Sequence, residues 1–463
     1  MQADLSKKDE QFREFSLNGP MWRVVLYVGF PLALYESLNQ LFKILDTMMA
    51  SHIGASAVSA VAYLSQINMM ISAVGTGLAV GASIKVSQAY GAGDFMLVKK
   101  RVSTMFAMCG ALGIAILLVL VPFTPEFLRL MNTPEEFIAD GSTYFRLELF
   151  GMVITFFNNV YIAIERARGN SKRILILNTA VIVVKLGLTA WFVYGLGGGI
   201  NMISCATIIS QSFLLLAACI NMNKKGNAFG FSLRAISIKK EVICPMLTLS
   251  FPVIVERIAF AVGKVIVNSM STVYGSWTVG ALGISNNIGG ITTNPQNGFQ
   301  EGGSSIISQN LGAGRPKRAL LAFRWVLYID MLIGLVIMTA SLLCLNQLAG
   351  LFAGDNAEFA EMIKQIYRFE AVGAIPLGVN AAVMALLYGF GKTRVTLVMN
   401  FCRVFPVLWA LQQFTDLGNV SAGIVMAVSN VASGVLAAVV GVIEIRRICN
   451  TYDVRYFGGE RKN

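Results

Sequence analysis

The sequence predicts an all-α membrane protein with twelve transmembrane helices in two parallel repeats of six. Three observations support this fold class: few charged residues, long apolar segments, and an internal repeat that covers most of the chain. Of the 463 residues, 55% are hydrophobic and only 13% are charged. A soluble domain carries about 25% charged residues, so the composition indicates a protein whose main solvent is lipid.

Each predicted span is an apolar run long enough to cross a bilayer. About 20 apolar residues cross the hydrocarbon as a helix, and helix is the default because backbone groups in lipid must be satisfied within the segment. The runs are continuous and lack alternation of period two, which argues against a membrane barrel. The twelve segments are 24–50, 56–88, 102–123, 143–165, 174–196, 201–221, 243–272, 277–309, 320–346, 366–389, 394–413 and 420–445.

The charges predict the orientation. If the helices alternate in direction, nearly all basic loop residues fall on one side, while the opposite loops hold only Arg129 and Lys364 among many acids. By the positive-inside rule both termini are then cytoplasmic, which predicts a multi-pass protein of the inner (cytoplasmic) membrane. The net charge of +12 therefore reflects topology, and we expect no nucleic-acid partner. The first twenty residues are polar and lack the apolar core of a secretory signal.

The repeat is visible in one short motif. SQAYGAGD at 87–94 returns as SQNLGAGR at 308–315, and residues 30–93 align without a gap on 251–314 at an offset of 221. One inserted residue later the offset is 222. Because six helices are an even number, both copies enter from the same side, which predicts parallel repeats related by an axis along the membrane normal. Within the motif, the glycines suit the left-handed conformation that ends a helix.

The repeat also sets the predicted domain boundaries. We expect the following order along the chain: a cytoplasmic N-terminal tail (1–20), an N-lobe with helices one to six (21–222), a cytoplasmic linker (223–241), a C-lobe with helices seven to twelve (242–446) and a cytoplasmic C-terminal tail (447–463).

Polar residues inside the spans mark candidate sites. An ionisable group in the hydrocarbon costs about 2.5–3.5 kcal/mol on insertion scales, and it usually faces a partner or a water-filled cavity. In the first span Glu36, Gln40, Lys43, Asp46 and Thr47 share one helical face. The seventh span carries Glu256, Lys264 and Asn268. A static pair of Lys43 with Asp46, or an interfacial place for Glu36 and Glu256, is the alternative to a cavity role.

Two further spans carry unusual polar residues. Lys185 stands in the middle of the fifth span with no acid nearby in sequence, so we expect its partner to be Asp46 or Glu36. In the eighth span Pro295 is expected to kink the helix, and Asn294, Gln296, Asn297, Gln300 and Glu301 surround it. A plain kink with buried amides is the alternative to a ligand site there. Arg368 and Glu370 are expected to form a structural pair at the outer interface.

The sequence gives little support for an enzyme. The seven cysteines stand singly without metal or disulfide spacing, and the single histidine, His52, falls in a predicted outer loop. No nucleophile motif, phosphate loop or nucleotide fingerprint is present. We therefore expect no catalytic residue and no cofactor.

Together these residues resemble the multidrug and toxic compound extrusion (MATE) family of secondary transporters. The likeness rests on twelve spans in two parallel bundles, on FPLALYESLNQLFKILDTMMASHIGASAVSAVA at 30–62, and on the duplicated SQ..GAG. The resemblance implies two lobes forming a V around a central cavity. It also implies alternating-access antiport that exports cationic or amphipathic compounds in exchange for inward Na⁺ or H⁺. We expect a monomer in the bilayer with small amphipathic molecules as substrates.

The resemblance also suggests residue roles. Asp46 matches the acid of the family's first helix, Asn178 resembles its fifth-helix asparagine, and Glu256 resembles the seventh-helix acid of one branch; Na⁺ could bind at Asp46 or Glu256. The position where another branch has an acid, four residues beyond Asn178, is Ile182 here. The expected coupling residues are Asp46, Glu36, Lys185, Asn178 and Glu256. The expected substrate-cavity residues are Lys43, Gln40, Asn158, Lys264, Asn268, Asn294, Gln296, Asn297 and Glu301.

Two other function classes compete with drug antiport. A flippase for lipid-linked oligosaccharide shares the superfamily architecture and needs basic residues for phosphate, and the spans hold Lys43, Lys85, Lys185, Lys264 and Arg403. A membrane scaffold or receptor is the other class, but it has no need of costly buried charges on matched helices.

Overall fold

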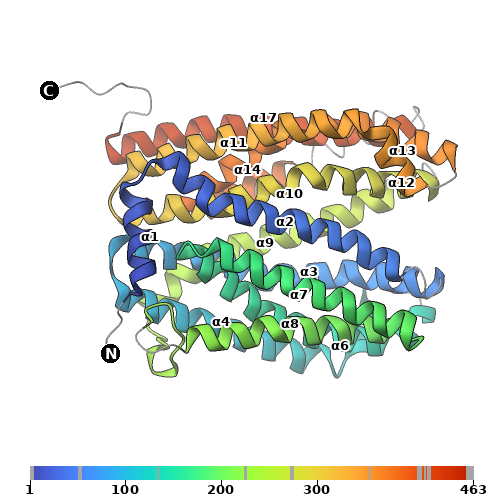
Figure 1. The fold of residues 1–463 in the computed structure, drawn as a ribbon, viewed down its shortest axis with the longest axis horizontal. Coiled ribbons are helices and arrows are strands. Elements are labelled where there is room, and N and C mark those ends of the chain that lie inside the picture. Colours follow the sequence, from blue (N-terminus) through green and yellow to red (C-terminus); the bar gives the residue numbers. More distant parts are fainter. Residues whose placement is uncertain are drawn as a thin grey trace. The chain divides into compact units, whose positions relative to one another are not determined.

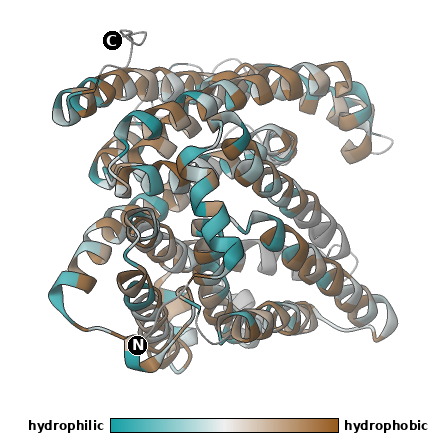
Figure 2. Cartoon of the chain, turned by 60° about the vertical axis from the view of Figure 1, so that its left-hand side comes forward, coloured by the Kyte–Doolittle hydropathy of each residue, from teal (hydrophilic) through white to brown (hydrophobic). Residues whose placement is uncertain are grey.

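The computed structural model describes residues 5–50, 55–131, 133, 135–223, 227–271, 276–353, 356–403, 409–410, 413 and 419–454, and over these ranges the chain is helical with no strand. Figure 1 shows long helices joined by short connections. In Figure 2 hydrophobic residues dominate most of the long helices. The predicted all-α fold class is thus confirmed for the part of the chain that is described.

The helices begin and end as follows: α1 Lys7–Asn18, α2 Met21–Ala50, α3 Ala55–Ala92, α4 Phe95–Leu120, α5 Thr124–Leu130, α6 Glu135–Ala167, α7 Ser171–Ala190, α8 Ile200–Met222, α9 Lys240–Ser271, α10 Ser276–Gly312, α11 Pro316–Leu343, α12 Leu345–Ala353, α13 Ala357–Ala371, α14 Ala374–Gly389, α15 Thr393–Cys402 and α17 Asn419–Tyr452. A π-helical turn, Trp191–Gly195, extends α7, and a short 3₁₀ turn covers Leu233–Ala235.

Eleven of the predicted spans fall largely on these helices, and the eleventh span, 394–413, lies on α15 as far as Cys402 and then passes mostly outside the described residues. Among the described residues, eight helices are long and apolar enough to cross a membrane, and α13 with α14, bent by 48°, gives a ninth candidate. The helices α2 and α10, which carry the polar positions of the first and eighth spans, are not among the eight. α10 runs as a continuous helix through Pro295, so the polar residues around Pro295 lie on helix rather than at a helix end.

Unit 1 comprises residues 1–10, 38–89 and 94–262, and unit 2 comprises residues 11–37, 90–93 and 263–463. In unit 1, α6 packs on α8 and α4, and α7 packs on α8. Backbone N–H groups of Ser232 and Ser237, in the predicted linker, donate to the hydroxyls of Ser103 and Thr104 on α4 (3.1 Å each). In unit 2, α10, α11 and α14 pack on one another, and α17 covers α13 and α14.

The two repeats use matched glycines for close helix packing. In unit 2, a Cβ on Gly298 of α10 would lie 2.4 Å from the backbone nitrogen of Ala33 on α2. In unit 1, a Cβ on Gly77 of α3 would lie 2.7 Å from the Cα of Ile254 on α9. Gly77 and Ala33 stand 221 residues before Gly298 and Ile254. The same repeat position therefore makes the same kind of contact in each unit.

The duplicated motif forms a clamp on the first helix within unit 2. Gly93 and Gly314 have φ angles of 82° and 71°, which confirms the predicted left-handed turn after each helix. Arg13 of α1 donates to the carbonyls of Tyr90 (3.0 Å) and Gly91 (2.8 Å) in the first copy. Arg315 of the second copy donates to the carbonyl of Leu17 (2.6 Å), near the end of α1. These donors satisfy carbonyls that a helix end leaves open.

Candidate functional site

A stripe of residues on α10 organises the candidate site in unit 2. Positions 285, 289, 292, 296, 299 and 303 follow one another at spacings of four and three, which places them on one helical face. Ser285, Thr292 and Gln296 are the polar members, and all three are buried. Because α10 packs against α11, α13 and α14, this stripe meets three neighbouring helices.

At one end of the stripe lies a buried carboxylate. The Ser285 hydroxyl donates to Oε2 of Glu370 on α13. A Cβ on Gly289 would lie 2.8 Å from Oε1 of the same residue, so only glycine leaves room for it. Glu370 is 8% exposed. Its position corrects our expectation of an interfacial pair, because Arg368 is exposed while Glu370 turns inward.

The middle of the stripe continues with hydroxyl groups. The hydroxyl oxygens of Tyr367 on α13 and Ser341 on α11 lie 2.7 Å apart, a hydrogen bond in which either can donate. Tyr367 also hydrogen-bonds to Thr292. The stripe on α10 is thereby joined to α11 and α13 by polar contacts in the protein interior, where a paired hydroxyl avoids the cost of an unmade bond.

Gln296 joins three helices. Its Nε2 donates to the main-chain oxygens of Asp330 on α11 and Ala374 on α14, both at 3.0 Å. Two glycines make room for its amide: a Cβ on Gly334 would lie 3.0 Å from this nitrogen, and a Cβ on Gly378 would lie 2.8 Å from it. The side chain is therefore held in a slot that α11 and α14 build around it.

Asp330 lies beside this slot. Its exposed fraction is 0%, and neither carboxylate oxygen has a hydrogen-bond partner among the described residues. Oε1 of Gln296 also lacks one. We name the set Ser285, Thr292, Gln296, Asp330, Ser341, Tyr367 and Glu370 the polar column.

The predicted residues of the first and seventh spans are described only in part. Glu36 and Gln40 are half-buried on α2, and Glu256 is buried on α9. All three interact with other groups. The side chains of Lys43, Asp46, Lys264 and Asn268 lie outside those that the structure describes.

Predicted residues of unit 1 are tied to their own surroundings. The Asn178 amide donates to the carbonyl of Ile174 in its own helix (2.8 Å), and Lys185 is half-buried and has an interaction partner. Asn158 on α6 donates to the main-chain oxygen (2.9 Å) and to Oε1 (2.8 Å) of Gln211 on α8. Asn158 thus links two helices of the unit.

The predicted cavity residues of the eighth span differ in burial. Gln296 is buried in the polar column, Asn294 and Glu301 are half-buried, and Asn297 is exposed. Sequence reasoning missed Asp330, although a signal was present: it is the one acid in the apolar run of α11, and an intramembrane acid is a functional candidate by default. It also missed Tyr367, which no local pattern marks, and the inward turn of Glu370.

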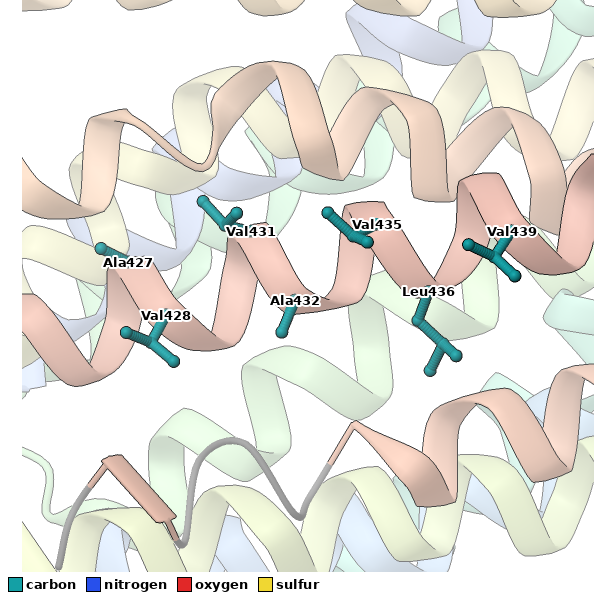
Figure 3. Close-up of a pocket in the computed structure, with 7 residues that line it drawn as sticks. All are labelled: Ala427, Val428, Val431, Ala432, Val435, Leu436 and Val439. Atoms are coloured by element: carbon teal, nitrogen blue, oxygen red, sulfur yellow. The ribbon is translucent and has the colours of Figure 1, made fainter. Parts of the chain in front are cut away.

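A different hollow lies along α17. Figure 3 shows it lined by aliphatic side chains of this one helix: Ala427, Val428, Val431, Ala432, Val435, Leu436 and Val439. Such a lining can accept hydrocarbon. It supplies no polar group to orient a ligand, whereas binding sites combine apolar walls with a few placed polar groups. The polar column is therefore the better candidate for ion chemistry.

Comparison with known proteins agrees with this architecture. The MatE family model matches twice, at residues 31–191 and 252–412, which reproduces the repeat offset of 221. The chain is 25% identical over 409 residues to the probable multidrug resistance protein YoeA of Bacillus subtilis, covering 86% of this chain and 88% of that protein. It is 23% identical over 432 residues to the multidrug export protein MepA of Staphylococcus aureus, covering 91% and 94%.

Solved structures show the same fold. A MATE crystallised in complex with MaL6 superposes with a TM-score of 0.89 at 20% identity, covering 96% of this chain and all of that one (100%). The outward-facing form of a multidrug resistance MATE transporter of the MOP superfamily gives a TM-score of 0.88 at 20% identity, covering 96% and 99%. Since the family model matches most of the chain, the protein belongs to the MatE family and is a membrane transporter, not an enzyme.

Proposed function

We propose that the protein is a cation-coupled antiporter that exports drug-like cationic or amphipathic compounds from the cytoplasm. The observation that carries this proposal is the family match over both repeats, together with relatives named multidrug resistance and export proteins that align along most of the chain. Buried acids in the interior of a membrane protein supply the chemistry that a coupling cation needs.

Coupling requires an ion that binds the two access states unequally, because only a difference in affinity shifts a conformational equilibrium. We assign this role to Asp46, with Glu36, Asn178, Lys185 and Glu256 as further coupling residues, and Na⁺ at Asp46 or Glu256 is one form of it. Burial of Glu256 supports its part in the proposal, because a buried acid binds or releases a cation according to its surroundings.

The substrate would meet the remaining predicted residues: Lys43, Gln40, Asn158, Lys264, Asn268, Asn294, Gln296, Asn297 and Glu301. In this proposal the lobes 21–222 and 242–446 alternate access, the 1–20 and 447–463 tails and the 223–241 linker are cytoplasmic, and the protein acts as a monomer in the inner membrane. Among the described residues, two of the basic groups that a flippase would use for phosphate have neutral side-chain partners. Lys85 donates to Oε1 of Gln88 (3.0 Å), and Arg403 donates to Oδ1 of Asn430 (3.3 Å).

The test is uptake of ethidium and of a fluoroquinolone into vesicles under separate sodium and proton gradients. Wild-type protein should accumulate both compounds under at least one gradient, and Asp46→Asn should lose the response to that gradient. Glu358→Gln is the matched control, since it removes an exposed acid outside the proposed sites. Equal uptake by Asp46→Asn and wild type under both gradients contradicts the coupling role. Flipping of a polyprenyl-linked sugar without drug uptake would replace the proposal with the flippase.

A further inference from the structure

The position of Asp330 is set by the face of α11 on which it lies. Val326, Asp330 and Gly334 are one turn apart and all are buried. At Val326 this face meets α10, where a Cβ on Gly303 would lie 2.6 Å from Val326 Cγ2. At Gly334 this face meets α14, because a Cβ on Gly334 would lie 2.8 Å from the main-chain oxygen of Ala374 on α14. The Asp330 carboxyl group is therefore enclosed by α10, α11 and α14, near the middle of a 28-residue helix.

An ionised carboxylate in this place would be very costly. Burying an unpaired ion carries a large desolvation penalty, so a buried acid neutralises unless a partner compensates it. Asp330 has no hydrogen bond to either oxygen from the described residues. Oε1 of Gln296 lacks a donor as well, although Nε2 of the same amide is 3.0 Å from the main-chain oxygen of Asp330.

A single proton on the Asp330 carboxyl would let it donate a hydrogen bond to Oε1 of Gln296, so that both groups gain a partner. A protonated carboxyl is a hydrogen-bond donor, and an amide oxygen is an acceptor. We propose that Asp330 and Gln296 form a proton-binding site at the centre of the α10–α11–α14 packing. In this site Asp330 carries the proton, and Gln296, fixed by its bonds to α11 and α14, is the positioning residue that offers its free oxygen.

The surroundings favour a proton over a metal ion. On α10 the neighbouring stripe residues are Thr292, Gln296 and Phe299, and α14 and α12 carry no acid, lysine or arginine. On α13 the titratable groups that turn inward are Tyr367 and Glu370, which are bonded to Ser341 and Ser285. Three unpartnered oxygens among the described residues are too few to replace the shell of a hard cation, which takes about six oxygen ligands or more.

Proton exchange at Asp330 would contribute to transport when the helix packing around it opens during the transport cycle. This exchange step rests on the proposed function. Separation of α11 from α10 or α14 would admit water, ionise Asp330 and release the proton. Closing would return the proton to the carboxyl oxygen. Proton transfer here forms and breaks only O–H bonds, and water is the acceptor and donor.

Infrared spectroscopy of the protein in lipid bilayers tests the binding step without any substrate. Wild-type protein at neutral pH should show a carboxylic-acid carbonyl band that Asp330→Asn loses and that the exposed-acid control Glu358→Gln keeps. Gln296→Leu should move this band, because the acid loses its acceptor. Asp330→Glu serves as a second variant that retains the acid if Asp330→Asn folds poorly. Identical acid bands in wild type and Asp330→Asn would overturn the proposal, as would disappearance of the wild-type band when Na⁺ replaces K⁺.

A transport measurement tests the exchange step. The number of protons moved per ethidium should fall in Asp330→Asn while Glu358→Gln keeps the wild-type ratio. An unchanged ratio in Asp330→Asn, with the infrared band assigned to Asp330, would show a static proton and overturn the exchange step. If wild-type protein moves no ethidium under any gradient, the proposed function fails, while the infrared result still decides the binding step.

Discussion

The same position in the two repeats is filled in opposite ways. In unit 1, the ring of Phe156 on α6 packs over Gly75 on α3, where a Cβ would lie 2.2 Å from the ring. In unit 2, the side chain of Gln296 on α10 packs over Gly378 on α14, where a Cβ would lie 2.8 Å from Nε2. Gly75 aligns with Gln296 at the offset of 221, and Phe156 aligns with Gly378 at 222. Large and small residues have thus changed places, and an apolar contact has become a polar one.

The exchange extends to the neighbouring helix. The alignment that pairs Gly113 with Gly334 also pairs Cys109 with Asp330, and both of these residues have an exposed fraction of 0%. Phe145 of α6 aligns with Tyr367 of α13. At these positions one backbone arrangement holds apolar side chains in the first repeat and members of the polar column in the second, whereas the counterpart of Glu370 in the first repeat is also an acid, Glu148. Since burying unpaired polar groups costs free energy, the difference indicates that the second repeat retains them for a function.

The largest loss of stability is expected when a bulky side chain at position 378 fills the space that holds the Gln296 amide. Gly378→Phe should lower the free energy of unfolding by about 3 kcal/mol or more, because the ring overlaps the Gln296 amide and overpacked cores relax poorly. The double variant Gln296→Gly with Gly378→Phe copies the first repeat and should recover most of this loss. Thermal unfolding of the purified variants checks both. Additive effects of the two changes would show that the residues are not coupled.

A transfer of the acid between repeats should give a smaller and asymmetric effect. Cys109→Asp should destabilise the protein by about 2 kcal/mol, because the first repeat offers the carboxyl no amide slot. Asp330→Cys should destabilise the protein by only about 1 kcal/mol, because it leaves Oε1 of Gln296 buried without the donor that we propose for it. The melting temperatures of the two variants decide this. Equal losses in both would mean that the two positions are electrostatically equivalent.

A third prediction concerns the bonds between Arg13 and the first copy of the duplicated motif. Loss of these charged hydrogen bonds should lower the free energy of unfolding by about 1–2 kcal/mol. Arg13 donates through two nitrogens to the first motif copy. Arg13→Lys should therefore fail to restore what Arg13→Ala removes, because an ammonium does not present a rigid pair of donors. Hydrogen exchange of the α1 amides should rise in both variants. Full protection in Arg13→Lys would contradict the two-carbonyl clamp.

The smallest change in stability is expected from loss of an exposed ion pair, which serves as a reference for the other variants. Lys364 and Glu361 form an ion pair of 2.6 Å on α13, with side-chain exposures of 20% and 46%. Lys364→Met should leave the free energy of unfolding nearly unchanged, because exposed pairs contribute little. A loss as large as that of Cys109→Asp would show that unfolding in this protein does not distinguish buried from exposed charge.

Local patterns in the sequence predicted the fold well. Apolar runs placed the spans on helices wherever the structure describes them, and the glycines of SQAYGAGD and SQNLGAGR predicted the turns that Gly93 and Gly314 make. α10 is helical through Pro295, as a helix kinked at proline also is, so the kink at this residue stays a prediction.

The candidate site was predicted less well. Gln296 was identified as a polar residue in a span, but its partners Asp330 and Ala374 lie 34 and 78 residues away in sequence, and no periodicity links them. Asp330 is a lone acid in an apolar run, and no residue near it in sequence marks Gln296 as its neighbour. Glu370 was placed outward because Arg368 stands two residues before it, yet residues two apart on a helix point to different faces.

Counterflow in sealed vesicles tests directly whether export of a substrate is coupled to opposite movement of a cation. Vesicles that contain wild-type protein, a pH indicator and a sodium indicator would be given an outward ethidium gradient with no imposed ion gradient. We expect that ethidium leaving through the protein drives H⁺ or Na⁺ the opposite way, and that Asp46→Asn abolishes this ion movement. Ethidium transport that moves neither ion, at the same rate in wild type and Asp46→Asn, would contradict cation-coupled antiport.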